Sequence, residues 1–196
     1  MKRKIVIACD SFKGCLGSGE VASAVTEGIR RVIPDDEIII SETADGGEGT
    51  GGILTKGMGG ETVTVCVNDP LGRLINAQYG ITSKVMSSEI TAGEATEKGR
   101  DLANWESGNK TAIIEMAQAS GLTLLSKEER NPLLTSTYGT GEMILDAVSK
   151  GCRKFLIGIG GSATNDGGTG MLEALGFRFL DKNGKEIKSC CGGRLG

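Results

Sequence analysis

The chain contains no histidine among its 196 residues, and this absence narrows the chemistry open to the protein. Histidine is the usual general base of nucleophilic catalysis, so Ser-His-Asp and Cys-His mechanisms are excluded. Carboxylates, lysines and metal ions remain as the groups that could perform catalysis.

Zinc sites built from paired cysteines are also absent. The six cysteines contain no C-x-x-C pair; they are Cys9, Cys15, Cys66, Cys152, Cys190 and Cys191. With no histidine to complete a ligand set, the usual zinc sites cannot be assembled. We therefore expect these cysteines to be reduced.

The chain has no long apolar run and little positive charge. Lys2-Arg3-Lys4 is its main basic run, the formal net charge is −3 and the isoelectric point is near 5.2. These features argue against nucleic acid and against an anionic membrane as partners. With 38% hydrophobic residues and 3 prolines, the composition is typical of an ordered globular chain, and we expect it to be cytoplasmic.

Glycine is abundant, at 32 residues, and five glycines gather in one segment. Residues 158–168, here called the glycine-rich loop, directly follow the apolar run Phe155-Leu156-Ile157. Glycines let backbone N–H groups approach an anion, and the polar residues Ser162, Thr164 and Asn165 can donate hydrogen bonds to phosphate oxygens. Asp166 would repel phosphate unless a divalent cation lay between them, so the segment favours Mg²⁺-nucleotide chemistry.

Two further loops follow predicted strands. Residues 10–17, the N-terminal loop, follow a predicted buried strand over 4–9, and apolar spacing predicts a helix over 18–33. A second strand over 37–41 leads into residues 44–50, the acidic loop, with sequence Ala-Asp-Gly-Gly-Glu-Gly-Thr. Strand-helix-strand order places both loops at one carboxyl edge, where open parallel sheets bind ligands.

The remaining pattern predicts a second lobe and a return to the first. Alternating valines over 63–67, a turn over 68–72 and a run over 74–81 predict an antiparallel hairpin. A polar excursion spans 83–109, a buried strand follows over 112–116, and a helix is predicted over 140–150 with Gly151 as its cap. A strand over 154–159 and a closing hairpin around Asn183-Gly184 follow.

We therefore expect an α/β fold: an open, mostly parallel Rossmann-like sheet with helices on both faces, plus a smaller β-rich α/β lobe. Residues 1–62 and 128–196 would form the Rossmann-like domain, incomplete at its C-terminus. Residues 63–127 would form the lobe.

Two nucleotide-binding patterns can be tested directly. The Walker sequence G-x-x-x-x-G-K-[ST] does not occur, which excludes an ordinary P-loop NTPase. Gly158-x-Gly160-x-x-Ala163 formally satisfies the dinucleotide fingerprint, so an NAD-binding oxidoreductase is an alternative. Against it, Gly167-Gly168 falls where a long helix would have to begin.

Four motifs, in order, resemble the type I glycerate kinases. They are Asp10-Ser11-Phe12-Lys13-Gly14, the acidic loop, Asn131-Pro132-Leu133 with Thr135 to Glu142, and the glycine-rich loop. The resemblance runs from Lys4 to about residue 193. It implies ATP-dependent, Mg²⁺-dependent phosphorylation of D-glycerate to 2- or 3-phosphoglycerate.

The resemblance and the loop chemistry together predict roles for individual residues. Phosphate binding is expected from Gly158, Gly160, Gly161, Ser162, Thr164, Asn165 and Gly167. Glycerate binding is expected from Ser11, Lys13, Gly46 and Gly47, and Mg²⁺ binding from Asp166 and Glu48. The catalytic residues are expected to be Asp10, Lys13, Asp45 and Asp166, with either Asp10 or Asp45 as the base.

The family's members are nearly twice as long as this chain. A second alternative is therefore a truncated, catalytically inactive fragment that binds nucleotide. The sequence leaves open which hydroxyl is phosphorylated and the oligomeric state, for which a homodimer is one alternative.

Overall fold

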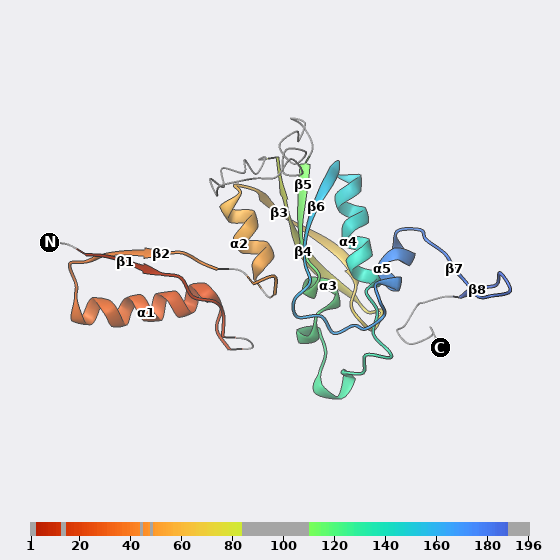
Figure 1. The fold of residues 1–196 in the computed structure, drawn as a ribbon, viewed down its shortest axis with the longest axis horizontal. Coiled ribbons are helices and arrows are strands. Elements are labelled where there is room, and N and C mark those ends of the chain that lie inside the picture. Colours follow the sequence, from red (N-terminus) through yellow and green to blue (C-terminus); the bar gives the residue numbers. More distant parts are fainter. Residues whose placement is uncertain (1–2, 13–14, 44, 48, 84–109, 188–196) are drawn as a thin grey trace, which may run out of the picture.

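The protein was analysed as a computed structural model that describes residues 3–12, 15–43, 45–47, 49–83 and 110–187. Strands and helices are mixed along the chain, so the predicted α/β class is confirmed (Figure 1). The strands are β1 (Lys4–Ile7), β2 (Glu37–Ile40), β3 (Glu61–Asn68), β4 (Leu74–Thr82), β5 (Lys110–Glu115), β6 (Cys152–Gly158), β7 (Phe179–Leu180) and β8 (Glu186–Ile187). The helices are α1 (Ser18–Val32), α2 (Thr50–Gly57), α3 (Ala117–Ser120), α4 (Tyr138–Ser149) and α5 (Thr169–Ala174), with 3₁₀ turns at Leu122–Leu124 and Lys127–Glu129.

The N-terminal β-α-β unit has the predicted order and a parallel β1–β2 pair, with Ile5 opposite Ile38. The predicted helix over 18–33 is confirmed as α1, whose first turn is tied by the Gly17 N–H donating to the Glu20 carboxylate at 2.8 Å. The strand predicted over 4–9 forms as β1 but ends at Ile7, and the expectation that it is buried was wrong, because Val6 is 59% exposed. The unit extends from one end of the molecule with α1 on a single face of the two strands (Figure 1).

A four-stranded sheet in the order β3-β4-β5-β6 forms the body of the molecule. The predicted hairpin is confirmed, with β3 and β4 antiparallel and Val65 opposite Ala77. β4 pairs antiparallel with β5, and β5 pairs parallel with β6. α2 and α4 lie on opposite faces of this sheet (Figure 1). The lobe boundary at 127/128 stays a prediction; β5 and β6, which lie on either side of it, share the sheet.

The core lies between α4 and the sheet. Its buried members include Val67, Ala77, Tyr79, Ile114, Met143, Ala147 and Cys152. The Tyr79 hydroxyl donates to Asp146 Oδ2 at 2.7 Å, and burial together with this bond raises the pKa of Tyr79 above its ordinary value. Apolar spacing predicts that Met143, Ile144, Ala147 and Val148 face inward. The first three are buried, and the prediction was wrong for Val148, which is 37% exposed.

The predicted glycine cap and the closing hairpin also form. Gly151 follows α4 with a φ of 89°, a conformation that glycine adopts without steric cost. β7 and β8 pair antiparallel around the Asn183-Gly184 turn. Of the predicted excursion over 83–109, residues 84–109 lie outside the described residues. Within the described residues, none of the helices has the length and apolar character needed to cross a membrane.

Candidate phosphoryl-transfer site

The glycine-rich loop leaves the carboxyl end of β6 and runs beside the segment that follows β5. Gly158 O accepts the Met116 N–H at 3.0 Å, Gly161 O accepts the Leu122 N–H at 2.9 Å, and the Ala163 N–H donates to Ser120 O at 2.9 Å. Backbone hydrogen bonds to the 116–122 segment thus hold both sides of the loop. The glycine-rich loop is therefore held in place at the carboxyl end of β6.

The acidic loop and the glycine-rich loop touch backbone to backbone. The Gly160 N–H donates to Gly46 O at 2.8 Å. A Cβ on Gly160 would lie 2.6 Å from Gly47 Cα, and one on Gly158 would lie 2.8 Å from Gly46 O. Only glycine leaves room for such an approach, so these two glycines let the loops meet. This contact was not predicted from the sequence, because β2 and β6, the strands before the two loops, belong to different sheets.

The polar residues predicted to hold phosphate lie close together after this contact. Ser162 Oγ and Thr164 Oγ1 are 2.9 Å apart, and the Thr164 N–H donates to Ser162 Oγ at 3.1 Å. Both side chains are half-buried, and Asn165 is exposed. Gly161 and Gly167 adopt φ values of 74° and 62°, which turn the loop sharply. Their phosphate-binding roles stay predictions.

Asp166 is buried, at 8% exposure, and its carboxylate is surrounded by donors. Oδ2 accepts the Thr137 N–H and hydroxyl, both at 2.8 Å, and the Gly170 N–H at 3.2 Å. Oδ1 accepts the Gly168 N–H at 3.0 Å. Charge-assisted bonds to backbone N–H groups are strong, so this carboxylate ties the segment before α4 to the start of α5.

These contacts bear on the predicted Mg²⁺ site. N–H dipoles that point at a carboxylate oxygen also point at any cation bound there, so Asp166 fits an anchoring role better than a direct metal ligand. Glu48, the other predicted ligand, lies outside the described residues. The described part of the chain contains no group of three or more Cys, Asp or Glu side chains placed to hold a metal ion.

The two candidate bases occupy different loops. Asp45 Oδ1 accepts the Gly47 N–H at 2.8 Å, which fixes Asp45 next to the junction of the acidic and glycine-rich loops. Asp10 Oδ1 accepts the Ser11 N–H at 2.7 Å in the N-terminal loop. Both side chains are exposed. Lys13 lies outside the described residues.

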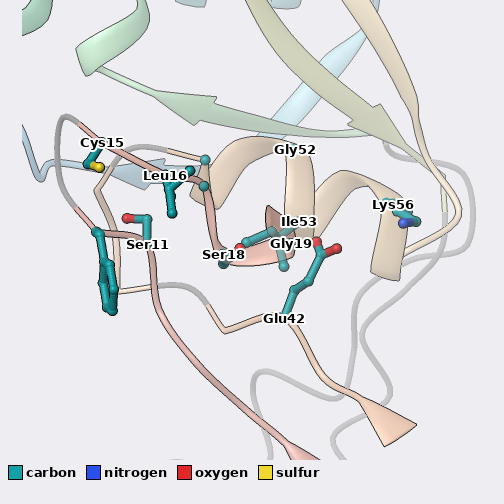
Figure 2. A pocket seen from close by; sticks show the side chains of 12 residues that line it. Ser11, Cys15, Leu16, Ser18, Gly19, Glu42, Gly52, Ile53 and Lys56 are labelled. Carbon is teal, nitrogen blue, oxygen red and sulfur yellow. The ribbon is translucent and has the colours of Figure 1, made fainter. Parts of the chain in front are cut away.

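A cavity of about 650 Å³ separates the N-terminal loop from α2. Ser11 and Cys15 lie on one side, Ile53 and Lys56 on the other, and Glu42 reaches toward the start of α1 between them (Figure 2). Its volume is within the range of small-molecule sites. Of the residues predicted to bind glycerate, Ser11 lines this cavity.

Glu115, the last residue of β5, was missed by the sequence analysis. Its carboxylate is buried and accepts the N–H groups of Gly49 and Gly51 at about 3.1 Å. The available signal was a charged residue that ends the apolar run Ala112-Ile113-Ile114. A charged residue directly after a buried apolar run is costly to bury unless it is hydrogen-bonded or paired.

The dinucleotide alternative fails on local structure. A dinucleotide fingerprint opens a long helix directly after its glycines. Here the helix after the glycine-rich loop begins only at Thr169 and has six residues. The formal match at Gly158, Gly160 and Ala163 is therefore not such a fingerprint.

Two touching glycine-rich loops beside a cavity form the kind of place where α/β proteins bind small ligands. Comparison with known proteins makes the assignment specific: the sequence model of the glycerate kinase family matches residues 5–196. The chain belongs to the glycerate kinase family.

Relatives of known name agree with this assignment. The chain is 44% identical over 183 residues to a glycerate kinase of Halalkalibacterium halodurans, covering 93% of this chain and 42% of that protein. It is 44% identical over 184 residues to a glycerate 2-kinase of Escherichia coli, covering 94% and 42%. A crystal structure of a protein assigned as glycerate kinase 2 from Salmonella typhimurium LT2 matches with a TM-score of 0.64 and 41% identity, over 95% of this chain and 44% of that one. The chain thus spans less than half the length of these relatives.

Proposed function

We propose that this chain carries part of the active site of a kinase that transfers the γ-phosphoryl group of ATP to a hydroxyl of D-glycerate. The backbone contact between the acidic and glycine-rich loops is the observation that carries the proposal. Gly160, one of the residues expected to bind phosphate, donates its N–H to Gly46 O, and Gly46 directly follows the candidate base Asp45. Family membership supports the substrate assignment.

In this proposal the phosphate groups of ATP lie along the glycine-rich loop, where Ser162 and Thr164 turn their hydroxyls toward phosphate oxygens. Glycerate lies near the acidic loop and the cavity beside Ser11, with Lys13 facing its carboxylate or the phosphoryl group. Asp45 accepts the proton of the attacking hydroxyl. A bond forms between the hydroxyl oxygen and the γ-phosphorus, the bond to the bridging oxygen breaks, and ADP departs with that electron pair.

Asp45 is preferred to Asp10 as the base because of its position. Its Asx turn with Gly47 holds the carboxylate at the junction of the two loops. Asp10 is held instead beside Ser11 at the cavity. Positioning supplies much of the rate in phosphoryl transfer, so the base must lie where the phosphate and the acceptor meet.

The metal enters the proposal only with the nucleotide. Mg²⁺ bound to ATP would neutralise phosphate charge. Asp166 is engaged by N–H donors, so no step is assigned to a metal on this chain. A cytoplasmic location, where ATP and organic acids are available, is part of the same proposal.

The name of the Escherichia coli relative, a glycerate 2-kinase, favours the 2-hydroxyl as the acceptor. We propose 2-phosphoglycerate as the product. ³¹P NMR of the product separates the two phosphoglycerates, and a 3-phosphoglycerate signal would refute this part.

The test is ADP release, coupled to a reporter, from ATP, Mg²⁺ and D-glycerate. Asp45→Asn should lower kcat by about 100-fold or more, the usual contribution of a general base. Asp181→Asn is the matched control, because Asp181 Oδ1 also accepts the N–H of the residue two positions on, at 2.8 Å, in the distant β7–β8 turn. A larger loss in Asp10→Asn than in Asp45→Asn would reverse the assignment of the base.

A second candidate is a nucleotide-binding fragment without turnover, favoured by the 42% coverage of the relatives. It predicts saturable binding of a fluorescent ATP analogue with no glycerate-dependent ADP release. Glycerate-dependent turnover by the 196-residue chain would exclude it.

A further inference from the structure

One buried carboxylate has no part in the chemistry proposed above. Glu115 is 3% exposed and ends β5, where it is paired with Gly158 of β6. Burying a carboxylate is costly unless hydrogen bonds compensate for its lost hydration. The groups that compensate for Glu115 therefore show what the residue does.

Two backbone N–H groups at the start of α2 are among them. Glu115 accepts the Gly49 N–H on both carboxylate oxygens, at 3.2 and 3.1 Å, and the Gly51 N–H on Oε2 at 3.1 Å. Gly49 is the N-cap of α2 and has no side chain to satisfy these N–H groups. Glu115 performs that task from a different element, and its negative charge suits the positive end of a helix.

The same contacts extend to the glycine-rich loop. Thr50, between the two glycines held by Glu115, accepts the Gly46 N–H on its hydroxyl at 3.0 Å. Gly46 O in turn accepts the Gly160 N–H at 2.8 Å. A continuous path therefore leads from the carboxylate on β5 through the start of α2 to the loop that follows β6.

Little slack is present along this path. A Cβ on Gly51 would just make van der Waals contact with Glu115 Cβ at 3.4 Å, whereas one on Gly160 would collide with Gly47, at 2.6 Å from its Cα. Tight packing transmits a displacement of the α2 start to Gly46 and Gly47. Loss of the carboxylate should therefore weaken the hydrogen bond from the Gly160 N–H to Gly46 O, although Glu115 makes no described hydrogen bond to Gly160.

We propose that Glu115 is a positioning residue that keeps the acidic loop against the glycine-rich loop. The residue itself touches neither ATP nor glycerate. It places Asp45 relative to the phosphate groups by fixing the helix start that follows the acidic loop. Its catalytic consequence rests on the proposed kinase function, whereas its effect on the loop contact does not.

The test compares three variants of the 196-residue chain by amide hydrogen exchange and by kinetics. Glu115→Leu keeps the side-chain bulk and removes both acceptors, and Glu115→Gln keeps one acceptor oxygen. Asp69→Asn is the matched control, because Asp69 is also 3% exposed and its Oδ1 accepts two backbone N–H groups, those of Leu71 and Arg73, in the β3–β4 turn.

Exchange at the Gly49, Gly51 and Gly160 amides should accelerate by about tenfold or more in Glu115→Leu, the loss expected for a hydrogen bond to a charged group. Glu115→Gln should restore most of the protection, and Asp69→Asn should leave these three amides unchanged. kcat should fall in the same order, with the KM for ATP changed less. Unchanged exchange at Gly160 in both Glu115 variants would overturn the proposal.

Two other results are also decisive. Acceleration spread evenly over the core strands would show a general stability role and overturn the proposal. If Glu115→Leu does not fold, amide exchange at Gly49 and Gly160 must still be a few fold faster in Glu115→Gln than in Asp69→Asn. Equal exchange rates in these two variants would overturn the proposal. A wild-type chain without turnover would count against the kinase proposal only, because the exchange pattern is measured without substrates.

Discussion

The contact between Gly160 and the acidic loop allows a quantitative prediction for Gly160→Ala. The added Cβ would lie 2.6 Å from Gly47 Cα and 2.9 Å from Gly46 O. Carbon atoms pack at about 3.5 to 4.0 Å, so the acidic loop must move away by about 1 Å. All the strain is steric, because Gly160 is not among the glycines with positive φ.

A displacement of that size should affect rate more than stability. Overpacking against backbone costs about 1 to 3 kcal/mol. A misplacement of about 1 Å between reacting groups can lower the rate by about 100-fold. We therefore expect a modest fall in the free energy of unfolding and a fall of about 100-fold in glycerate-dependent kcat, measured by denaturant titration and ADP release.

Gly28→Ala is the control for the glycine substitution itself. Gly28 lies within α1, and a Cβ there would meet no atom within 4 Å. Alanine should stabilise this helix by up to about 1 kcal/mol and leave kcat unchanged. The reasoning fails if Gly160→Ala retains wild-type kcat together with wild-type amide exchange at Gly46 and Gly47.

Three further substitutions test the packing around the site. Asp166→Asn should lower the free energy of unfolding by about 3 kcal/mol, because an amide nitrogen cannot accept the N–H bonds that the carboxylate accepts; an unchanged denaturation midpoint would contradict its anchoring role. The pKa of Tyr79 is raised in the folded state, so the contribution of Tyr79 to the free energy of unfolding is fully present below its ordinary pKa of 10.0 and is lost as the pH rises above it. Tyr79→Phe should therefore reduce the loss of thermal stability at alkaline pH. An unaltered pH profile would exclude Tyr79 as the source of that loss. Gly80→Ala should destabilise by about 1 to 3 kcal/mol, because its Cβ would lie 1.8 Å from Thr55 Oγ1; Thr55→Ala in the same chain should recover part of the loss, and strict additivity would refute the clash.

Elements with a regular apolar period were predictable from the sequence. The spacing of Val21 and Ile29 predicted α1, and the alternating valines of 63–67 predicted β3, because the local period reports which residues share a face. Burial was less predictable. β1 has the composition of a buried strand, but whether a strand is covered depends on neighbours that the local sequence does not specify.

The candidate site was predictable in outline. The glycine-rich and acidic loops were found because each is rich in glycine and follows a predicted strand. Their contact with each other was not predicted, since β2 and β6 belong to different sheets. The roles of individual carboxylates were less accessible. The Mg²⁺ role of Asp166 stays a prediction, and the sequence did not indicate that its carboxylate accepts the Thr137 and Gly170 N–H groups.

The sequence by itself determined the α/β class, the position of most strands and helices and the family, because these depend on local periodicity and on motifs written in order along the chain. Only the tertiary structure decided that Gly160 touches Gly46, that Glu115 holds Gly49 and that Asp166 holds Thr137. Each of these pairs joins residues separated by at least 29 positions. No local pattern specifies which N–H group a distant carboxylate or carbonyl will meet, so that choice is made by the packing of the whole sheet and its helices.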